Sequence, residues 1–230
     1  MSWFAGTLLE RPPGPKYAKV LTYAELCPAT PLPKPKTLTK WRRQLSQGFH
    51  LSLRAPSTLW RADDKSADDS LKSSIAWLAE SADALRASLV VLPTGSMFTT
   101  GQRDRERLAE LVEKLGSRLD APIVWLPGGL WEPVQALRFA GKIGAVCGVD
   151  GIDVIAQRTA EPATTGTTQD TVYTFFDAKG ARRSFPPSVL AEHVEQISTA
   201  GPSRVFTTIA SHRSFDEAKS LQQMFDETRA

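Results

Sequence analysis

The stretch of sequence that decides the fold is Pro33 to Pro56, PKPKTLTKWRRQLSQGFHLSLRAP. Its prolines predict an extended start, because proline fixes φ and disfavours helix in the residue before it. Thr37 is then the expected N-cap of a short helix over LTKWRRQL, in which apolar residues recur at helical spacing. The letters FHLSL alternate as in a strand, and Arg54 follows at the strand's carboxyl end. This order predicts one unit of a β/α repeat.

The same alternation of strand and helix patterns extends along the chain in both directions. Eight apolar segments are predicted to contain strands: Trp3–Thr7, Ala18–Leu26, Phe49–Ala55, Leu89–Pro93, Pro122–Pro127, Gly144–Asp150, Thr171–Asp177 and Arg204–Ile209. Helical periodicity fills most of the intervals, as in Asp69–Ala87 and Arg103–Leu115. Eight strands with interposed helices predict a parallel sheet with right-handed crossovers, and eight is the count that closes a TIM barrel.

The first crossover departs from this rhythm. Between Thr7 and Ala18 the chain reads LLERPPGPKY, which contains three prolines and a glycine and leaves no room for a packed helix. We therefore predict one α/β domain over residues 1–230, a TIM-like (β/α)8 barrel whose first crossover helix is reduced or missing. Such a barrel has one thin wall, which a partner subunit would cover. The polar segment Gln157–Asp170 is expected to be a long loop, either mobile filler or a lid.

Composition excludes several classes of protein. Hydrophobic residues make up 41% and charged residues 23% of the chain, which argues against a disordered protein. No apolar run approaches the roughly 20 residues of a membrane span, and the first residues lack a secretory pattern, so we expect a cytoplasmic protein without membrane contact. The net charge of +3 is spread along the chain, and no role in nucleic-acid binding is expected.

Metal and cofactor patterns are missing from the sequence. Cys27 and Cys147 lie far apart, and the three histidines share no HxH or HExxH spacing, so no metal site is predicted. His193 is expected on the surface of a helix that begins at Pro187. Neither a GxGxxG pattern nor a Walker lysine appears, and we predict no cofactor.

The stretch from Pro33 to Pro56 also resembles a known family. It is similar to the signature P-x-P-x-T-hydrophobic-x-x-W … G-F-x-F-x-x-K-A-P of the YecE-like proteins, TIM-barrel proteins classed as a domain of unknown function. LVVLPTGSMF, at 89–98, resembles their strand and loop hydrophobic-F-Q-L-P-P-S-F. The resemblance covers most of the chain and implies the same barrel.

The departures from the family pattern bear on function. The family's Glu-x-Asn pair on the second strand is reduced to Glu25, and its third-strand lysine appears as Arg54. Trp125 stands near a family carboxylate on the fifth strand, and Asp177 lies near the family's Arg and His on the seventh. If those polar residues form the family's site, most are lost here, and the resemblance implies a divergent member without catalysis, a pseudoenzyme.

Six residues near the carboxyl ends of the strands form the candidate ligand-binding site, since TIM barrels carry their catalytic and ligand-binding residues at this end. They are Glu25, Arg54, Trp125, Asp150, Asp177 and His212. Arg54 would bind an anion through its fixed donor fork, and Asp150 or Asp177 could pair with it. The alternative is an arginine that is neutralised for structural reasons alone.

The remaining candidates have alternatives of the same kind. Glu25 with Asp150 or Asp177 would suit general acid/base hydrolysis, although carboxylates at strand ends also cap helices. Trp125 is predicted to fill the barrel mouth with an apolar plate. His212 is expected in a loop that faces either a ligand or only solvent.

Three functions remain open on the sequence. The favoured one is a non-catalytic barrel that binds a small anionic ligand or a protein partner. The second is a hydrolase of a sugar-like or phosphorylated small molecule, for which no catalytic residue can be assigned. The third is a structural subunit that pairs as a homodimer through the thin wall, which requires an apolar patch beside Trp3 and Leu8.

Overall fold

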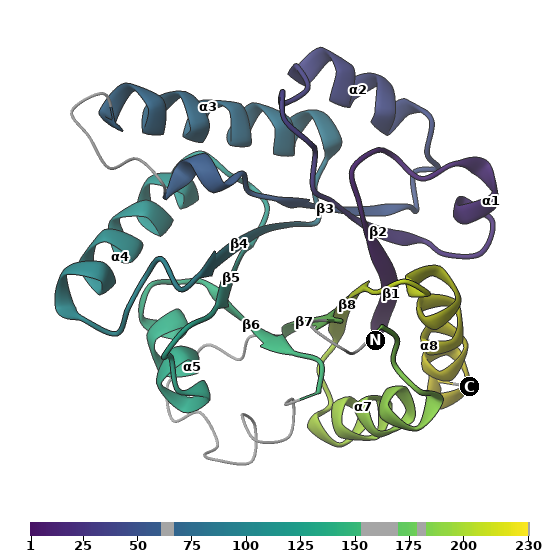
Figure 1. Ribbon diagram of the computed structural model, residues 1–230. Helices are drawn as coiled ribbons and strands as arrows, with labels where there is room; N and C mark the ends of the chain where they lie inside the picture. Colours follow the sequence, from purple (N-terminus) through teal and green to yellow (C-terminus); the bar gives the residue numbers. More distant parts are fainter. Residues whose placement is uncertain (61–66, 153–169, 179–182, 230) are drawn as a thin grey trace.

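A computed structural model describes residues 1–60, 67–152, 170–178 and 183–229 of the chain. Eight parallel strands close into a barrel in sequence order, and β8 pairs with β1 (Figure 1). The strands are β1 Ser2–Leu9, β2 Tyr23–Leu26, β3 His50–Arg54, β4 Leu89–Gly95, β5 Ile123–Pro127, β6 Val146–Asp150, β7 Thr171–Asp177 and β8 Arg204–Ala210. The TIM-like barrel predicted from the sequence is confirmed.

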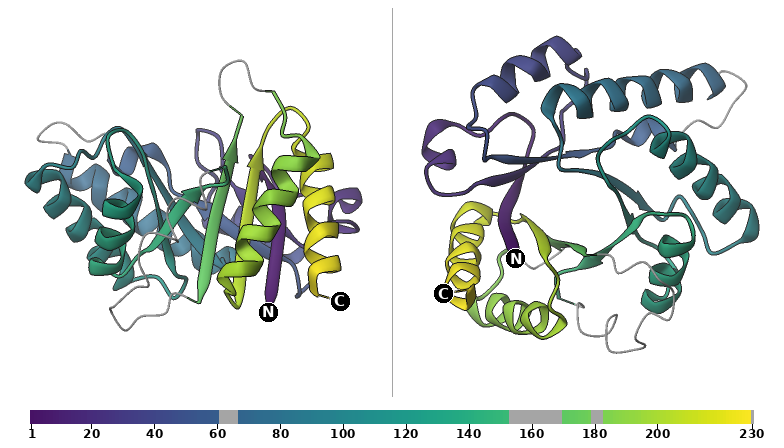
Figure 2. Two further views of the ribbon diagram at one scale, coloured as in Figure 1. Left: turned by 90° about the horizontal axis from the view of Figure 1, so that it is seen from below. Right: turned by 180° about the vertical axis from the view of Figure 1, so that it is seen from behind.

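Helices surround the barrel on the outside (Figures 1 and 2). They are α1 Pro15–Ala18, α2 Pro35–Arg43, α3 Ala67–Leu85, α4 Gln102–Gly116, α5 Pro133–Lys142, α7 Pro187–Ala200 and α8 Ser214–Arg229, with a short 3-10 turn η1 at Ser57–Leu59. Both termini lie at the amino-terminal end of the barrel (Figure 2). The predicted loop at 157–169 lies outside the described residues.

The first crossover is short, as predicted. Its helix α1 is a single turn. The hydroxyl of Tyr17 on this turn forms hydrogen bonds with strands β1 and β2. This hydroxyl accepts the Thr7 backbone N–H at 3.0 Å and donates to the Tyr23 carbonyl at 2.8 Å. β1 and β2 approach so closely at Gly6 that a Cβ there would overlap the Tyr23 carbonyl. Glycine is therefore required at this position.

The thin wall leaves an open hollow of about 470 Å³ beside α1. Leu8, Leu9 and Tyr17 contribute to its lining, and the ring of Phe215, 36% exposed, lies 5.4 Å from that of Tyr17. Trp3 is only 3% exposed, because it packs under α8 against Phe225. The expected apolar patch therefore does not include Trp3.

The start of α2 differs from the prediction. The helix begins at Pro35 with Lys34 as its N-cap, and the expected cap Thr37 lies within the first turn. Proline is favoured at the first helical position, because its fixed φ suits the helix and its missing N–H is not needed there. The run of prolines that predicted an extended segment thus also starts the helix.

Alternation along the strands divides the core into two layers. One set of side chains fills the barrel interior: Tyr23, Leu89, Val91, Val124, Val146, Tyr173, Phe175 and Phe206. The intervening residues, such as Leu51 and Leu53, pack under the helices. His193 belongs to this outer layer and is 1% exposed, so its predicted place on the surface is wrong. Its ring lies 4.8 Å from that of Phe176.

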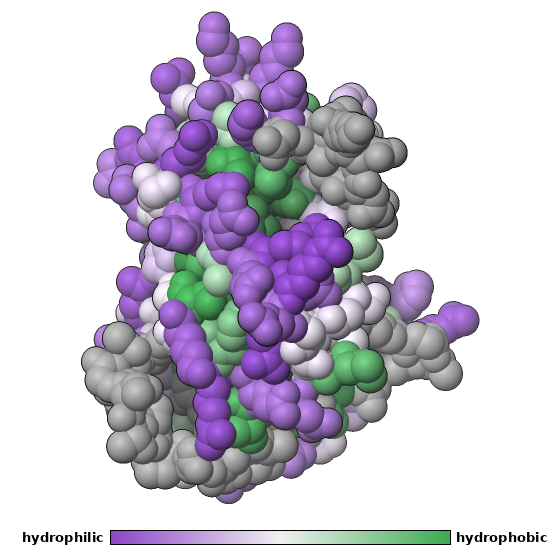
Figure 3. Space-filling model, turned by 90° about the vertical axis from the view of Figure 1, so that its left-hand side faces the viewer, coloured by the Kyte–Doolittle hydropathy of each residue, from purple (hydrophilic) through white to green (hydrophobic). Residues whose placement is uncertain are grey.

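The outer faces of the helices are polar. On α4, for which helical periodicity predicted a helix over Arg103–Leu115, the buried residues are Leu108, Leu111, Val112 and Leu115. Figure 3 shows the side of the molecule that carries α4, where hydrophilic residues predominate and hydrophobic ones appear in patches between them. None of the described helices is long and apolar enough to cross a membrane.

Candidate functional site

A buried carboxylate lies at the carboxyl-terminal half of the barrel interior. Glu25, on β2, is fully buried, and each of its oxygens is hydrogen-bonded. Oε1 accepts from Arg54 Nε on the adjacent strand β3 at 2.5 Å. Oε2 accepts from the hydroxyls of Tyr173 on β7 and Thr208 on β8, at 2.5 and 2.9 Å; both strands lie beyond β1 in the closed barrel. A buried carboxylate needs such donors, because an unpaired charge in the interior is costly.

A second tyrosine extends the network. The hydroxyl of Tyr23 lies 3.1 Å from Ser52 Oγ and 2.9 Å from Thr208 Oγ1. Tyr23 and Glu25 share the interior face of β2, as Ser52 and Arg54 share that of β3, because alternate residues of a strand point the same way. Strands β2, β3, β7 and β8 are therefore joined across the interior by polar side chains.

Electrostatics fixes the protonation of this network near neutral pH. Burial by itself would lower the pKa of Arg54, but the adjacent Glu25 carboxylate raises it above its ordinary value. Burial, and then the charge of Glu25, raise the pKa of Tyr173 well above its usual range. Burial and Glu25 raise the pKa of Tyr23 as well. Arginine and both tyrosines therefore remain hydrogen-bond donors and do not exchange protons near pH 7.

Arg54 retains donors that Glu25 does not use. Its guanidinium carbon lies 4.4 Å from the ring centroid of Phe175, and its side chain is 11% exposed. Nη2 is buried and has no hydrogen-bond partner among the described residues. A guanidinium is thus held rigidly on one side by Glu25 and on one face by Phe175, with N–H groups left for another acceptor.

The two aspartates of the predicted site lie on β6 and β7. Asp150 is exposed at the end of β6, and its Oδ1 accepts the Ile152 backbone N–H at 2.9 Å. Asp177 is half-buried at the end of β7, two residues after Phe175. The ion-pair partner of Arg54 is Glu25. The structure thus brings Glu25 and Arg54 together as an ion pair.

Trp125 is on the opposite face of its strand from the one predicted. It is fully buried under the helices, where Nε1 donates to Thr94 Oγ1 at 2.9 Å and the ring meets Trp131 edge-on at 4.9 Å. The next residue, Leu126, is the one that joins the interior cluster. The prediction that Trp125 fills the mouth is therefore wrong, because a register one residue different reverses the faces of a strand.

His212 lies outside the buried network. It is exposed on the turn after β8, and its backbone N–H donates to the Arg183 carbonyl at 3.1 Å. The structure places it at the carboxyl end of the barrel, as the sequence predicted. No group of three or more metal-ligating side chains occurs in the part of the chain that the structure describes.

Sequence reasoning missed four members of the network: Tyr23, Ser52, Tyr173 and Thr208. A signal for two of them was present. Tyr23 and Ser52 each precede a predicted site residue by two positions, which places them on the same strand face. Tyr173 and Thr208 are 148 and 183 residues from Glu25, and only the closure of the barrel brings them to it.

Comparisons with known proteins agree with this architecture. A DUF72 family protein from Enterococcus faecalis V583 superposes with a TM-score of 0.72 at 14% identity, over 99% of this chain and 96% of that one. The chain has a TIM-barrel fold. Endonuclease IV from Thermus thermophilus gives a TM-score of 0.62 at 14% identity, over 99% and 100% of the two chains.

An L-ribulose 3-epimerase is similar to a lesser degree, with a TM-score of 0.60 at 10% identity over 99% and 94% of the chains. No protein-family model matches the sequence, and no curated protein matches it. At these identities the likenesses show the fold alone, because one barrel fold carries many chemistries.

Proposed function

We propose that this protein is a divergent YecE-like barrel that binds a small anionic ligand without catalysis, with Arg54 as the anion-binding group. The observation that carries the proposal is the buried Nη2 of Arg54, which has no hydrogen-bond partner among the described residues. A buried donor without a partner is costly, so such a group in a native protein calls for an explanation. A bound carboxylate or phosphate oxygen would supply the missing acceptor.

The surroundings of Arg54 suit an anion. Glu25 holds Nε, and the ring of Phe175 lies against the guanidinium, so few conformations remain to be lost on binding. The planar donor fork matches the geometry of carboxylate and phosphate groups. Its position at the carboxyl end of β3 is where barrels of this type bind their ligands.

The same geometry argues against the hydrolase alternative. Paired carboxylates work as acid and base only if both reach the scissile bond. Glu25 is fully buried, and both its oxygens already accept hydrogen bonds. Neither tyrosine of the network has a pKa suited to proton transfer near neutrality. We therefore assign Glu25 the role of positioning Arg54.

A cytoplasmic location remains part of this proposal, on the basis of composition.

A thermal-shift screen tests the proposal, with dicarboxylates, sugar phosphates and nucleotides as ligands. A ligand at 100 times its dissociation constant should stabilise the protein by about 2.7 kcal/mol. Arg54→Lys keeps the charge but loses the fork, and we expect it to weaken that ligand about tenfold or more, or about 1.4 kcal/mol.

Equal stabilisation of the wild type and Arg54→Lys would refute the role of Arg54. Turnover of a screened compound that disappears in Glu25→Gln would replace the proposal with the hydrolase alternative.

A further inference from the structure

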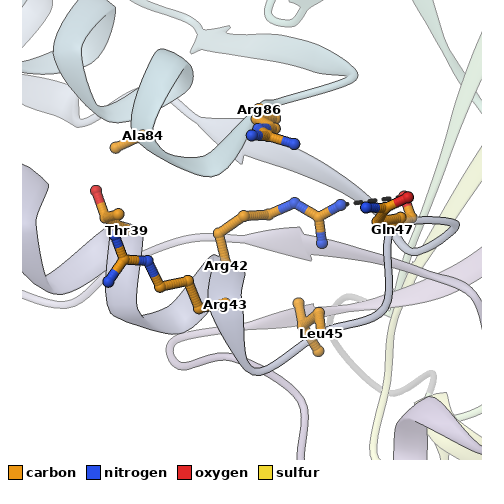
Figure 4. Close-up of a pocket in the computed structure, with 7 residues that line it drawn as sticks. All are labelled: Thr39, Arg42, Arg43, Leu45, Gln47, Ala84 and Arg86. Atoms are coloured by element: carbon orange, nitrogen blue, oxygen red, sulfur yellow. Dashed lines mark hydrogen bonds between the residues drawn. The ribbon is translucent and has the colours of Figure 1, made fainter.

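We propose that a groove between α2 and α3 binds the phosphate group of a small phosphorylated molecule or inorganic phosphate. The groove measures about 260 Å³ and includes Arg42, Arg43 and Arg86 in its lining (Figure 4). It lies at the amino-terminal end of the barrel, because α2 runs back from the strand carboxyl ends to the start of β3. It is therefore separate from the ligand site proposed at Arg54.

Arg42 is held in the groove by the loop that follows its own helix. Nη1 donates to the Ser46 carbonyl at 2.9 Å, and Nη2 donates to the Gln47 carbonyl at 3.1 Å. Both carbonyls lie in the loop that follows α2, which ends at Arg43. A guanidinium has five N–H groups, so three remain for an acceptor in the groove. The side chain is therefore already ordered before a ligand arrives.

Arg86 occupies a backbone position that disfavours it. It follows α3 with φ at +50°, in the left-handed region, and its N–H donates to the Asp83 carbonyl at 2.8 Å. Glycine is the usual residue at this place after a helix, because a Cβ is strained there. An arginine at such a strained position points to a role for its side chain in the groove.

The positive charge in the groove is not neutralised within the described part of the chain. Burial lowers the pKa of Arg42, and the nearby charge of Arg86 lowers it further. No ion pair joins Arg42, Arg43 or Arg86 to a described carboxylate. The Ser46 and Gln47 carbonyls in the loop after α2 account for the position of Arg42, but not for the positions of Arg43 and Arg86. A bound anion would relieve the repulsion between them.

Shape and chemistry favour phosphate among the anions. Figure 4 shows the Arg42 and Arg86 side chains approaching one another from facing segments, while Arg43 reaches back beside Thr39. Two converging guanidinium groups suit a group with several charged oxygens. The volume is slightly below the usual range of about 300–1,000 Å³ for small-molecule pockets. It therefore has room for a phosphate group and part of a small molecule attached to it.

Isothermal titration calorimetry at low salt tests the inference, with inorganic phosphate and glycerol phosphate as separate probes. We expect wild-type dissociation constants of about 1 mM or below. Arg86→Gly should weaken binding at least about tenfold while leaving the melting temperature unchanged or higher, since glycine relieves the positive φ. If glycerol phosphate binds more tightly than inorganic phosphate, the natural ligand is a phosphorylated molecule. If the two probes bind equally, the ligand is inorganic phosphate.

Two control variants locate the effect. Arg103→Gln removes a likewise exposed charge from α4 and should bind both probes as the wild type does. The titrations are repeated in the Arg54→Lys background, where any phosphate binding at Arg54 is weakened, and Arg86→Gly should cause the same loss there; failure of the site proposed at Arg54 would therefore leave this result unaffected. The inference is overturned if wild-type protein binds neither probe, or if Arg86→Gly binds them as tightly as wild type.

Discussion

Removing the guanidinium of Arg54 should destabilise the protein strongly, and removing its partner as well should restore most of the loss. Arg54→Met keeps an unbranched apolar stem but leaves the fully buried Glu25 carboxylate without its cation. The hydroxyls of Tyr173 and Thr208 still donate to that carboxylate, but they carry no charge. In Glu25→Gln/Arg54→Met, a neutral amide oxygen accepts the same two hydroxyls, and no buried charge remains.

The expected loss of stability follows from the burial of the Glu25–Arg54 pair. Removing one partner of a buried ion pair costs about 3–5 kcal/mol, whereas replacing both by neutral groups is often close to neutral. For a chain of 230 residues, about 1 kcal/mol corresponds to a change of about 2 °C in melting temperature. Arg54→Met should therefore melt about 6–10 °C lower, and the double variant within about 2–4 °C of wild type.

Urea denaturation of wild type, both single variants and the double variant gives the coupling free energy between the two side chains. We expect about 3 kcal/mol or more. The exposed Lys114–Glu110 pair, 2.6 Å apart, is the matched control, and its alanine cycle should show no measurable coupling. A coupling below about 1 kcal/mol between Glu25 and Arg54 would show that the buried network does not act as a unit.

Three further predictions concern other parts of the barrel. Burial lowers the pKa of His193 from 6.5 to about 3, so the unfolded chain binds a proton that the folded chain refuses. The stability that comes from keeping His193 neutral is complete above about pH 6.5 and falls by about 1.4 kcal/mol per pH unit below it. His193→Gln should reduce this slope in urea titrations, and an unchanged slope would contradict the role of His193. Gly6→Ala should lower the free energy of unfolding in urea by about 3 kcal/mol or more, because a Cβ at Gly6 overlaps the Tyr23 carbonyl. Gly14→Ala, where a Cβ meets open space, should leave the stability unchanged. Trp125→Phe loses the bond to Thr94 and should cost about 1–3 kcal/mol by the same method, with ligand binding at Arg54 unchanged in calorimetry; weaker ligand binding would contradict its place outside the barrel.

Local patterns predicted most of the fold. The alternation of FHLSL predicted a strand, and the structure confirms β3 at His50–Arg54. Leu51 and Leu53 lie together on its helix-covered face. The prolines and glycine of LLERPPGPKY predicted a first crossover without a full helix, and α1 has one turn. These predictions succeed because φ restriction and side-chain alternation act over a few residues and hold in any tertiary setting.

Predictions that needed an exact register or cap were less secure. Thr37 and Pro35 both suit the start of a helix, and the packing of α2 uses Pro35. Trp125 and Leu126 are adjacent apolar residues, so the sequence does not say which one faces the interior. Pairing of β5 with β4 and β6 decides it, because a shift of one residue exchanges the two faces.

The sequence by itself determined a parallel eight-stranded barrel and placed Glu25 and Arg54 near the carboxyl ends of neighbouring strands. Only the tertiary structure decided that the two pair with each other, and that Tyr173 and Thr208 complete the carboxylate's hydrogen bonds. The same holds for the groove, where Arg42 and Arg86 come from different helical segments. The physical reason is that strand and helix patterns are local, whereas the partners of a buried or crowded charge are set by closure of the barrel and packing of its helices.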